Sequence, residues 1–260
     1  MEIILFLICL IASTVGAVVG AGGGVIIKPV LDFFGFFSVS TISFLSGCTV
    51  LSMALVSLAT SRKSDVKIEV KQSTLLAIGS IIGGVAGKSL FDFLLHSFED
   101  ESSVGMIQSI ALTIVTLLIF FYVSKKDSLP SLHVKGIIPC ILIGLLLGIV
   151  SAFLGIGGGP LNLGILYFFF SMDAKQAAKN SLYIIIFSQV SSLALTIGRQ
   201  TVPEFTLSYL LVMMAGGIGG ALVGRRLSKK LSNRAVEKLF QGMMVFIILI
   251  NIYNIFQYMG

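Results

Sequence analysis

Apolar stretches of about 20 residues recur along the whole 260-residue chain, and this feature restricts its fold more than any other. A helix of that length crosses the roughly 30 Å hydrocarbon core of a bilayer. Hydrophobic residues make up 56% of the chain and charged residues only 12%, and the mean hydropathy is +1.02. Water-soluble globular domains lie far from this composition. We therefore predict an all-α, polytopic integral protein of the cell membrane, with a single transmembrane domain over residues 1–260.

Two kinds of apolar segment can be distinguished. Residues 3–37 and 137–171 are each too long for one crossing, and each is interrupted by a glycine cluster that only about a dozen apolar residues follow. The clusters read GAGGG (Gly20–Gly24) and GIGGGP (Gly155–Pro160). Because consecutive glycines break a helix, both segments are predicted to be broken-helix hairpins. Single crossings are expected at 38–60, 72–95, 104–123, 176–198, 206–226 and 236–258.

The two halves of the chain resemble each other. At an offset of 135 residues, the glycines of the first cluster fall on those of the second. At an offset of 137, a spaced series Gly79, Gly83, Gly87, Lys88 falls on Gly216, Gly220, Gly224, Arg225. Self-similarity of this extent indicates an internal repeat. We predict repeat 1 over residues 1–126 and repeat 2 over residues 133–260, each a hairpin followed by three transmembrane helices.

The distribution of charge predicts how the repeats are oriented. If each hairpin enters and returns on one side, the segments 60–71, 124–136, 172–179 and 225–238 share a side and hold 15 of the 18 Lys and Arg residues. Cytoplasmic loops carry such an excess of cations. The acidic stretch Glu99–Glu101 then faces the other side. A hairpin plus three crossings reverses direction, so the second repeat is predicted to be inverted.

The glycine clusters are candidates for a binding site. Irregular backbone at membrane depth survives only when it is buried in protein or lines a wet cavity. The helix that starts after each break presents free N–H groups and a positive dipole end, which favour an anion. We predict substrate contacts at Gly22, Gly23, Gly24, Gly157, Gly158 and Gly159. The alternative is that the glycines only allow close helix packing, and we prefer that explanation for the spaced series.

Several polar side chains in the apolar segments are further candidates. Lys28 follows the first cluster by four residues and either contacts substrate, pairs with Asp32, or extends to the interface. The Asn162 side-chain amide either donates a hydrogen bond to an anion or forms a hydrogen bond at the end of its helix. The remaining candidates, which either line a pathway or join helices, are Ser46, Asn180, Ser181 and Gln189. Lys88 and Arg225 end their crossings and are expected to anchor at the interface.

Other classes of protein fit the sequence poorly. Cys9, Cys48 and Cys140 lie in apolar runs without metal-ligand spacing, so they are expected to be buried, free thiols, and neither a metal nor a cofactor is predicted. The histidines lie at the ends of crossings, and no carboxylate pair is evident within one, which argues against an enzyme. The net charge of +6 is explained by cytoplasmic loops and not by nucleic acid. Residues 1–20 lack a basic start and are expected to be retained.

The motifs GAGGGVIIKPVL, GIGGGPLNLGIL, GGVAGKSL and GALVGRRL together make the chain resemble the TauE/SafE family of sulfite exporter-like transporters over nearly its full length. The resemblance implies two repeated halves that each begin with a glycine-rich motif near a proline. It also implies transport of small sulfur-containing anions such as sulfite, sulfonates, sulfoacetate or thiosulfate. The family commonly has a threonine–serine pair early in the second long helix of each half. Here those positions hold Ser46-Gly47 and Asn180-Ser181.

The expected function is therefore secondary transport of a small anion, in the direction of export, by alternating access around the two breaks. The alternatives are an anion channel and a membrane scaffold that does not transport. The expected partners are the anionic substrate and membrane lipids, with a homodimer left open. No acidic residue stands out as a proton carrier, so proton coupling and flux down the membrane potential both stay open.

Overall fold

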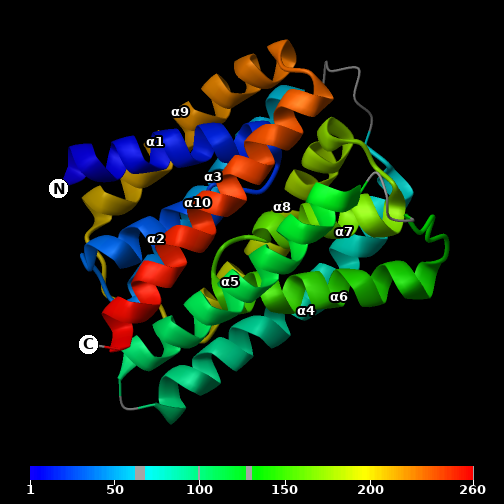
Figure 1. Cartoon of the computed structure of the whole chain (residues 1–260). Helices are drawn as coiled ribbons and strands as arrows, with labels where there is room; N and C mark the ends of the chain where they lie inside the picture. Colours follow the sequence, from blue (N-terminus) through cyan, green and yellow to red (C-terminus); the bar gives the residue numbers. More distant parts are fainter. Residues whose placement is uncertain (62–67, 99, 127–130, 260) are drawn as a thin grey trace.

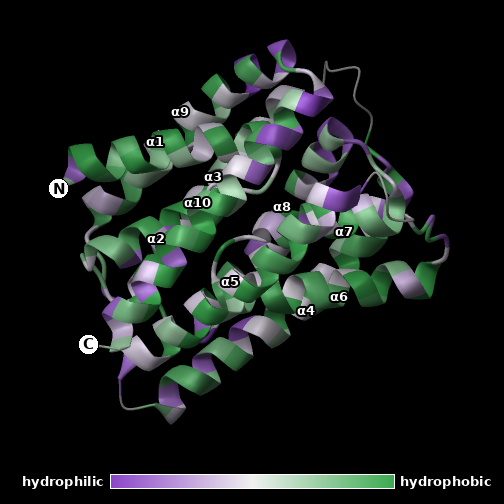
Figure 2. Ribbon diagram, in the orientation of Figure 1, coloured by the Kyte–Doolittle hydropathy of each residue, from purple (hydrophilic) through white to green (hydrophobic). Residues whose placement is uncertain are grey.

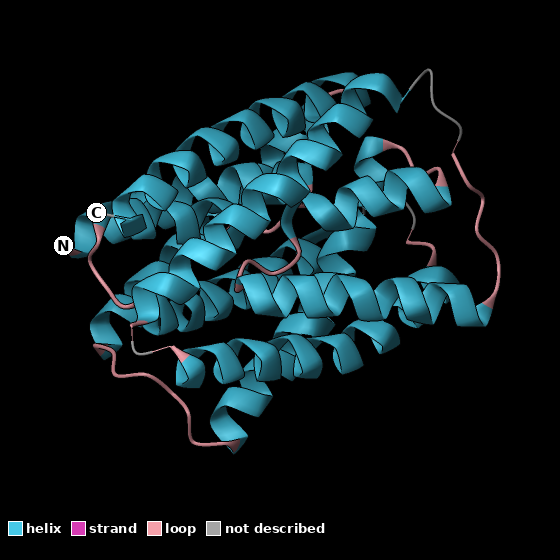
Figure 3. Ribbon diagram, turned by 60° about the horizontal axis from the view of Figure 1, so that its bottom comes forward, coloured by secondary structure: helices cyan, strands magenta, loops and turns pink. Residues whose placement is uncertain are grey.

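The computed structural model describes residues 1–61, 68–98, 100–126 and 131–259. Within these ranges the chain forms α-helices joined by loops and contains no strand (Figure 3). Eight helices are long and apolar enough to cross a membrane. The predicted all-α, multi-pass architecture is thus confirmed. The helices are α1 (Glu2–Val19), α2 (Gly24–Phe34), α3 (Val39–Thr60), α4 (Val70–Ser97), α5 (Glu101–Lys125), α6 (Ile137–Leu154), α7 (Gly159–Phe170), α8 (Ala174–Gly198), α9 (Leu207–Lys230) and α10 (Asn233–Met259).

Both long segments are broken where the glycines predicted. α1 ends at Gly20 with φ 84°, and α6 ends at Gly155 with φ 65°. Because L-residues with a side chain rarely adopt this left-handed conformation, glycine is the residue that can end both helices in this way. α2 and α7 start four residues further on, and α2 turns back toward the end of the bundle where the chain begins (Figure 1).

The two halves interlock along their lengths. The most extensive packing joins α4 with α6 and α1 with α9, so each half places its first helix against the fourth helix of the other. α3 also lies against α9 as α4 lies against α8, and α5 packs on α10 (Figure 1). This exchange of equivalent helices is what a pseudo-symmetric pair of repeats would produce. The two repeats, with their boundaries and inversion, stay predictions.

The spaced glycines serve helix packing, as expected. A Cβ added at Gly216, Gly220 or Gly224 of α9 would lie 2.7, 2.6 or 2.5 Å from successive carbonyl oxygens of α1. The equivalent glycines of α4 meet carbonyl oxygens of α6 even more closely. Small residues four apart let two backbones approach in this way. The packing interpretation of these glycines is confirmed.

The connections at one end of the bundle carry most of the basic residues. Contacts that join these connections include an ion pair from Lys126 to Glu237 (2.6 Å) and a hydrogen bond from the Lys175 amide to Asn233 (3.2 Å). Figure 2 shows hydrophilic residues at the helix ends and hydrophobic residues along the outside of the bundle. Asp100 lies at the start of α5, at the opposite end (Figure 1). The remaining charges of these segments, Arg62, Lys63, Lys67 and Glu99, lie outside the described residues.

Candidate functional site

The two glycine breaks lie against each other inside the protein. A Cβ added at Gly24 would stand 2.7 Å from the carbonyl oxygen of Ile156, and one at Gly22 would stand 3.9 Å from that of Gly157. The space beside the breaks is filled by Val50 and Ile185, which occupy equivalent positions in α3 and α8. The two helix starts therefore meet in a closely packed, buried contact.

Backbone groups at the breaks nevertheless lack partners. Within the described part of the chain, the amides of Gly22, Gly157 and Gly158 have no protein acceptor. All three glycines are buried. A buried N–H without a partner is costly, and such groups are normally satisfied by water or a ligand. The breaks thus supply unused hydrogen-bond donors in the centre of the membrane domain.

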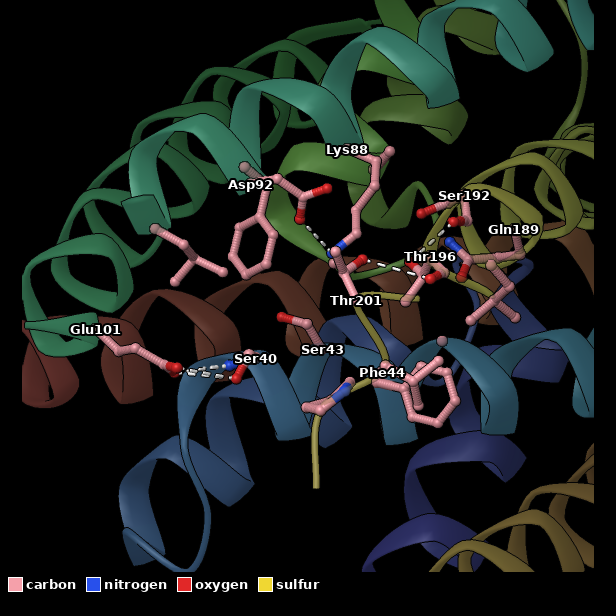
Figure 4. A pocket seen from close by; sticks show the side chains of 18 of the residues that line it. Ser40, Ser43, Phe44, Lys88, Asp92, Glu101, Gln189, Ser192, Thr196 and Thr201 are labelled. Atoms are coloured by element: carbon pink, nitrogen blue, oxygen red, sulfur yellow. Dashed lines mark hydrogen bonds and ion pairs between the residues drawn. The ribbon is translucent and has the colours of Figure 1, made fainter. Parts of the chain in front are cut away.

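A polar pocket of about 430 Å³ adjoins the second break. Its walls come from α3, the C-terminal half of α4, the start of α5, the C-terminal half of α8 and the loop after it (Figure 4). Gly155 lines the pocket, and a Cβ added at Gly157 would be 3.5 Å from the Gln189 amide nitrogen in its wall. The polar and charged lining residues are Ser40, Ser43, Lys88, Asp92, His96, Glu101, Gln189, Ser192, Thr196 and Thr201.

Charged groups on the pocket wall are paired. The Lys88 ammonium lies 2.8 Å from Oδ1 of Asp92 and 4.5 Å above the centre of the Phe91 ring. The Arg199 guanidinium lies 3.6 Å from the other carboxylate oxygen, Oδ2, which accepts no hydrogen bond from the described residues. Glu101 is held separately, because its carboxylate accepts from the amide and hydroxyl of Ser40 (Figure 4). Two cations therefore share one carboxylate at the outer end of the pocket.

Lys28 is buried directly behind the pocket. Its ammonium donates to Oε1 of Gln108 (2.8 Å) and to the hydroxyl of Ser43 (3.2 Å), which lines the pocket. Both acceptors are neutral. No ion pair joins Lys28 to Asp32 in the described residues, although Asp32 is itself buried, with one oxygen lacking a partner. The hydrogen-bond partners of this buried ammonium are neutral, and the carboxylates of Asp32 and Glu101 act on its charge from further away.

The predicted site residues fall into three groups. Gln189 lines the pocket, and Lys28 and Gly157 adjoin its walls through Ser43 and Gln189. Gly22, Gly23, Gly24, Gly158, Gly159 and Asn162 belong to the buried meeting of the breaks, where a Cβ at Gly158 would collide with the Asn162 side chain. Away from the pocket lining lie Ser46 and Ser181, buried with unpaired hydroxyls, and Asn180.

Asn180 joins two helices. Its side-chain oxygen accepts from the Glu69 amide (3.0 Å) and from the Ser73 hydroxyl, and its nitrogen donates to the Gln176 carbonyl (2.7 Å). These bonds tie the start of α4 to α8. The helix-joining alternative for Asn180 is the one that its contacts support.

Some pocket residues were not identified from the sequence. Lys88 was assigned to the membrane interface, but it lies in the pocket and pairs with Asp92. The buried Asp32 and the pocket carboxylate Asp92 also show that acidic groups do occur within the membrane domain. A useful signal existed, because the i, i+4 spacing of Lys88 and Asp92 near the end of an apolar segment is typical of a pair on one helix face.

Nothing in the described residues suggests a metal centre. No group of three His, Cys, Asp or Glu side chains within these ranges is arranged to hold a metal ion. The three cysteines are free; Cys9 and Cys140 are buried and Cys48 is partly so. The pocket lining offers hydroxyls, one amide, one ammonium, one imidazole and two carboxylates to a molecule that enters it.

A helical membrane bundle with two paired helix breaks and a polar pocket beside one of them has the architecture of a secondary transporter. Comparison with known proteins agrees. Residues 5–250 match the family described as "Sulfite exporter TauE/SafE", so the chain belongs to this family of membrane transporters.

Two relatives are named as transporters. The chain is 24% identical over 270 residues to "Probable membrane transporter protein YunE" of Bacillus subtilis, covering 94% of this chain and 95% of the relative. It is 27% identical over 198 residues to a "Probable membrane transporter protein" of Haemophilus influenzae, covering 74% and 70% of the two chains.

Proposed function

We propose that this transporter exports small sulfur-containing anions, such as sulfite, sulfonates, sulfoacetate or thiosulfate, by alternating access around the two glycine breaks. The observation that carries the proposal is the second break, where buried amides without acceptors adjoin a pocket that holds polar donors and cations. Oxyanions of sulfur accept several hydrogen bonds, which such a pocket supplies from Ser43, Gln189 and Ser192.

Lys28 gives the pocket its selectivity for negative charge in this proposal. The residue is 3% exposed, and its ammonium uses two of its three donors on neutral groups. The charge acts through Ser43, whose hydroxyl both accepts from Lys28 and faces the pocket (Figure 4). In surroundings poor in water such a charge attracts an anion more strongly than it would at the surface.

The packing around the first break favours a carrier over a channel. A channel needs a continuous path, whereas Gly20 lies so close to Ala178 that an added Cβ would overlap the α8 backbone. In this proposal the contact between Gly20 and Ala178 is the closed side of the carrier, and the pocket is its open side. A carrier that exposes its site to one side at a time has this asymmetry.

Transport is tested in proteoliposomes loaded with sulfite, thiosulfate, a small sulfonate or a carboxylate of similar size. We expect saturable efflux of sulfur anions, and Gly158→Val should abolish it because Gly158 has φ 111° and no room for a side chain. Gly242→Val is the matched control, since Gly242 has open space around it. Monodisperse protein in gel filtration must accompany the loss. Full efflux by a folded Gly158→Val variant would refute the site.

Substitution of Lys28 tests the source of charge selectivity. We expect Lys28→Ala to weaken anion binding by about 10- to 100-fold, the loss of a charge-assisted interaction of roughly 1.4–2.7 kcal/mol. The measurement is the apparent affinity for sulfite or thiosulfate from the rise in melting temperature with concentration. Lys71→Ala, at an exposed position at the other end of the protein, is the control. Unchanged affinity would reassign Lys28 to a structural role.

A further inference from the structure

The cations outside the basic end of the protein gather around one place. Fifteen of the 18 Lys and Arg residues lie in the segments expected on the cytoplasmic side. The other three are Lys28, Lys88 and Arg199. Lys88 lines the pocket, Arg199 contacts the Asp92 carboxylate that lines it, and Lys28 donates to Ser43 in its wall. The positive-inside bias disfavours cations at this end, so their presence around the pocket requires another explanation.

Lys88 and Asp92 are held in place by the helices around them. Gly87, directly before Lys88, packs against the backbone of Ile149 in α6, and Gly84 packs against Ser188 and Ser191 in α8. α4 is therefore fixed between two helices where it presents Lys88. The side chains of Lys88 and Asp92 are each 13% exposed, while that of Arg199 is 46% exposed. Arg199 is thus more exposed than Lys88, and its contact with Asp92 connects it to the pocket.

This group is unevenly paired around Asp92, although Glu101 balances the charge of the pocket wall as a whole. One carboxylate, that of Asp92, faces two cations, and its oxygen toward Arg199 is buried without a hydrogen bond. Glu101 also lines the pocket; it accepts hydrogen bonds from Ser40 and has no ion pair with Lys88 or Arg199. Partly exposed ion pairs contribute little stability. At Asp92 two cations converge on one carboxylate, so an anion from solution can complete the pairing there.

On this geometry, and resting on the anion transport proposed above, we propose that Lys88 and Arg199 form a second anion subsite at the outer end of the pocket. It binds a sulfonate, sulfite or carboxylate group, and Asp92 is its internal competitor. When the pocket is empty, the Asp92 carboxylate pairs with the Lys88 ammonium. A bound anion replaces this carboxylate as the partner of Lys88. The subsite at Lys88 on α4 and the buried charge of Lys28 behind α3 then attract the anion from two sides of the pocket.

The local potential can be measured without any transported substrate. Ser192 shares the pocket with Lys88 (Figure 4), so Ser192→Cys in a variant lacking Cys9, Cys48 and Cys140 is a suitable reporter. Its thiol is labelled with 2-sulfonatoethyl methanethiosulfonate, an anion, and with the 2-trimethylammonioethyl reagent, a cation. We expect Lys88→Gln to lower the anion-to-cation rate ratio, and Asp92→Asn to raise it, each by about fivefold or more. Lys71→Gln should leave the ratio unchanged.

Binding of inorganic sulfite to the purified, full-length transporter provides the second measurement. We expect Lys88→Gln to weaken it at least about tenfold, Arg199→Gln by less, and Asp92→Asn to strengthen it severalfold, because the competitor is removed. An Asp92→Asn variant that lowers both the rate ratio and the sulfite affinity would overturn the competitor role. A rate ratio unaffected by Lys88→Gln would overturn the subsite.

These results separate the subsite from the transport proposal. Labelling reports the potential inside the pocket even if no sulfur anion is transported, so failure of efflux with the expected ratios would refute only the transport proposal. Lys88→Arg keeps the positive charge, so its anion-to-cation labelling ratio is expected to stay within twofold of the parent. This variant replaces Lys88→Gln in the test if Lys88→Gln does not fold. A folded Lys88→Arg variant whose ratio falls to that expected for Lys88→Gln would also count against the subsite.

Discussion

The two glycine breaks share one backbone plan but have different surroundings. Gly20 and Gly155 are equivalent and both end a helix in the left-handed conformation. Gly20 faces Ala178, where an added Cβ would overlap backbone atoms. Gly155 faces Ser43, which is the equivalent position in the other half, and there an added Cβ would stand 2.9 Å from a side-chain hydroxyl on the edge of the pocket.

This difference does not come from the size of the side chains. Serine and alanine differ by one hydroxyl, which is too little to decide whether a helix backbone closes on a break. The helices themselves are placed differently: α8 lies directly against the first break, while α3 stands off from the second. We interpret the structure as one state of the transporter, with the pocket reached from the end opposite the basic loops.

The largest effect is expected from alanine at the two break positions. Both substitutions place a side chain at a left-handed residue, at a cost of about 1–2 kcal/mol. Gly20→Ala also collides with the α8 backbone, so its total destabilisation should reach about 3–5 kcal/mol and little folded protein should be recovered. Gly155→Ala should be recovered as folded protein, with a melting temperature lowered by only about 2–8 °C. Equal loss of stability in the two variants would show that the breaks are packed alike.

Accessibility of the two facing residues should differ by a smaller factor. In a variant lacking the native cysteines, Ser43→Cys is expected to react with an anionic thiol reagent applied from the pocket side at least about tenfold faster than Ala178→Cys. Ser43 lines the pocket, whereas Ala178 is buried at 6% exposure. Under conditions of net transport the Ala178→Cys rate should rise. Fast labelling of both positions in the absence of substrate would support a channel.

The smallest effects should separate two polar residues of α8. Asn180→Ala removes the bonds to Glu69 and Ser73, so it should lower stability by about 1–3 kcal/mol while sulfite affinity is maintained. Gln189→Ala should weaken affinity severalfold with a smaller change in melting temperature, because Gln189 lines the pocket. Thermal denaturation with and without sulfite measures both quantities. If Asn180→Ala instead weakens sulfite affinity and Gln189→Ala mainly lowers stability, Asn180 belongs to the binding site.

Much of the fold could be predicted from the sequence because each element has a local cause. Apolar length sets the crossings, and the glycine clusters set the breaks within a residue or two. The pocket could not be predicted in the same way. Its residues come from α3, α4, α8 and the loop after α8, and only Gln189 among the predicted side chains lies in its lining.

Lys88 illustrates why the pocket could not be predicted from the sequence. Its place near the end of an apolar segment fits an interfacial anchor as well as a pocket residue, and the helix periodicity does not distinguish the two. The charge count offered a better guide: once the basic loops are assigned to one side, Lys28, Lys88 and Arg199 are left over. Those three cations surround the pocket.

By itself the sequence determined that this chain is a multi-pass helical membrane protein whose long segments are broken at two glycine clusters. Hydrocarbon thickness and the conformational preference of glycine act on each segment separately, so no knowledge of the partners was needed. Only the tertiary structure decided that the breaks lie back to back, and that the pocket forms beside the second break. Those features depend on how α3 and α8 pack against the breaks, and helix packing is set by surfaces that come together only in the folded protein.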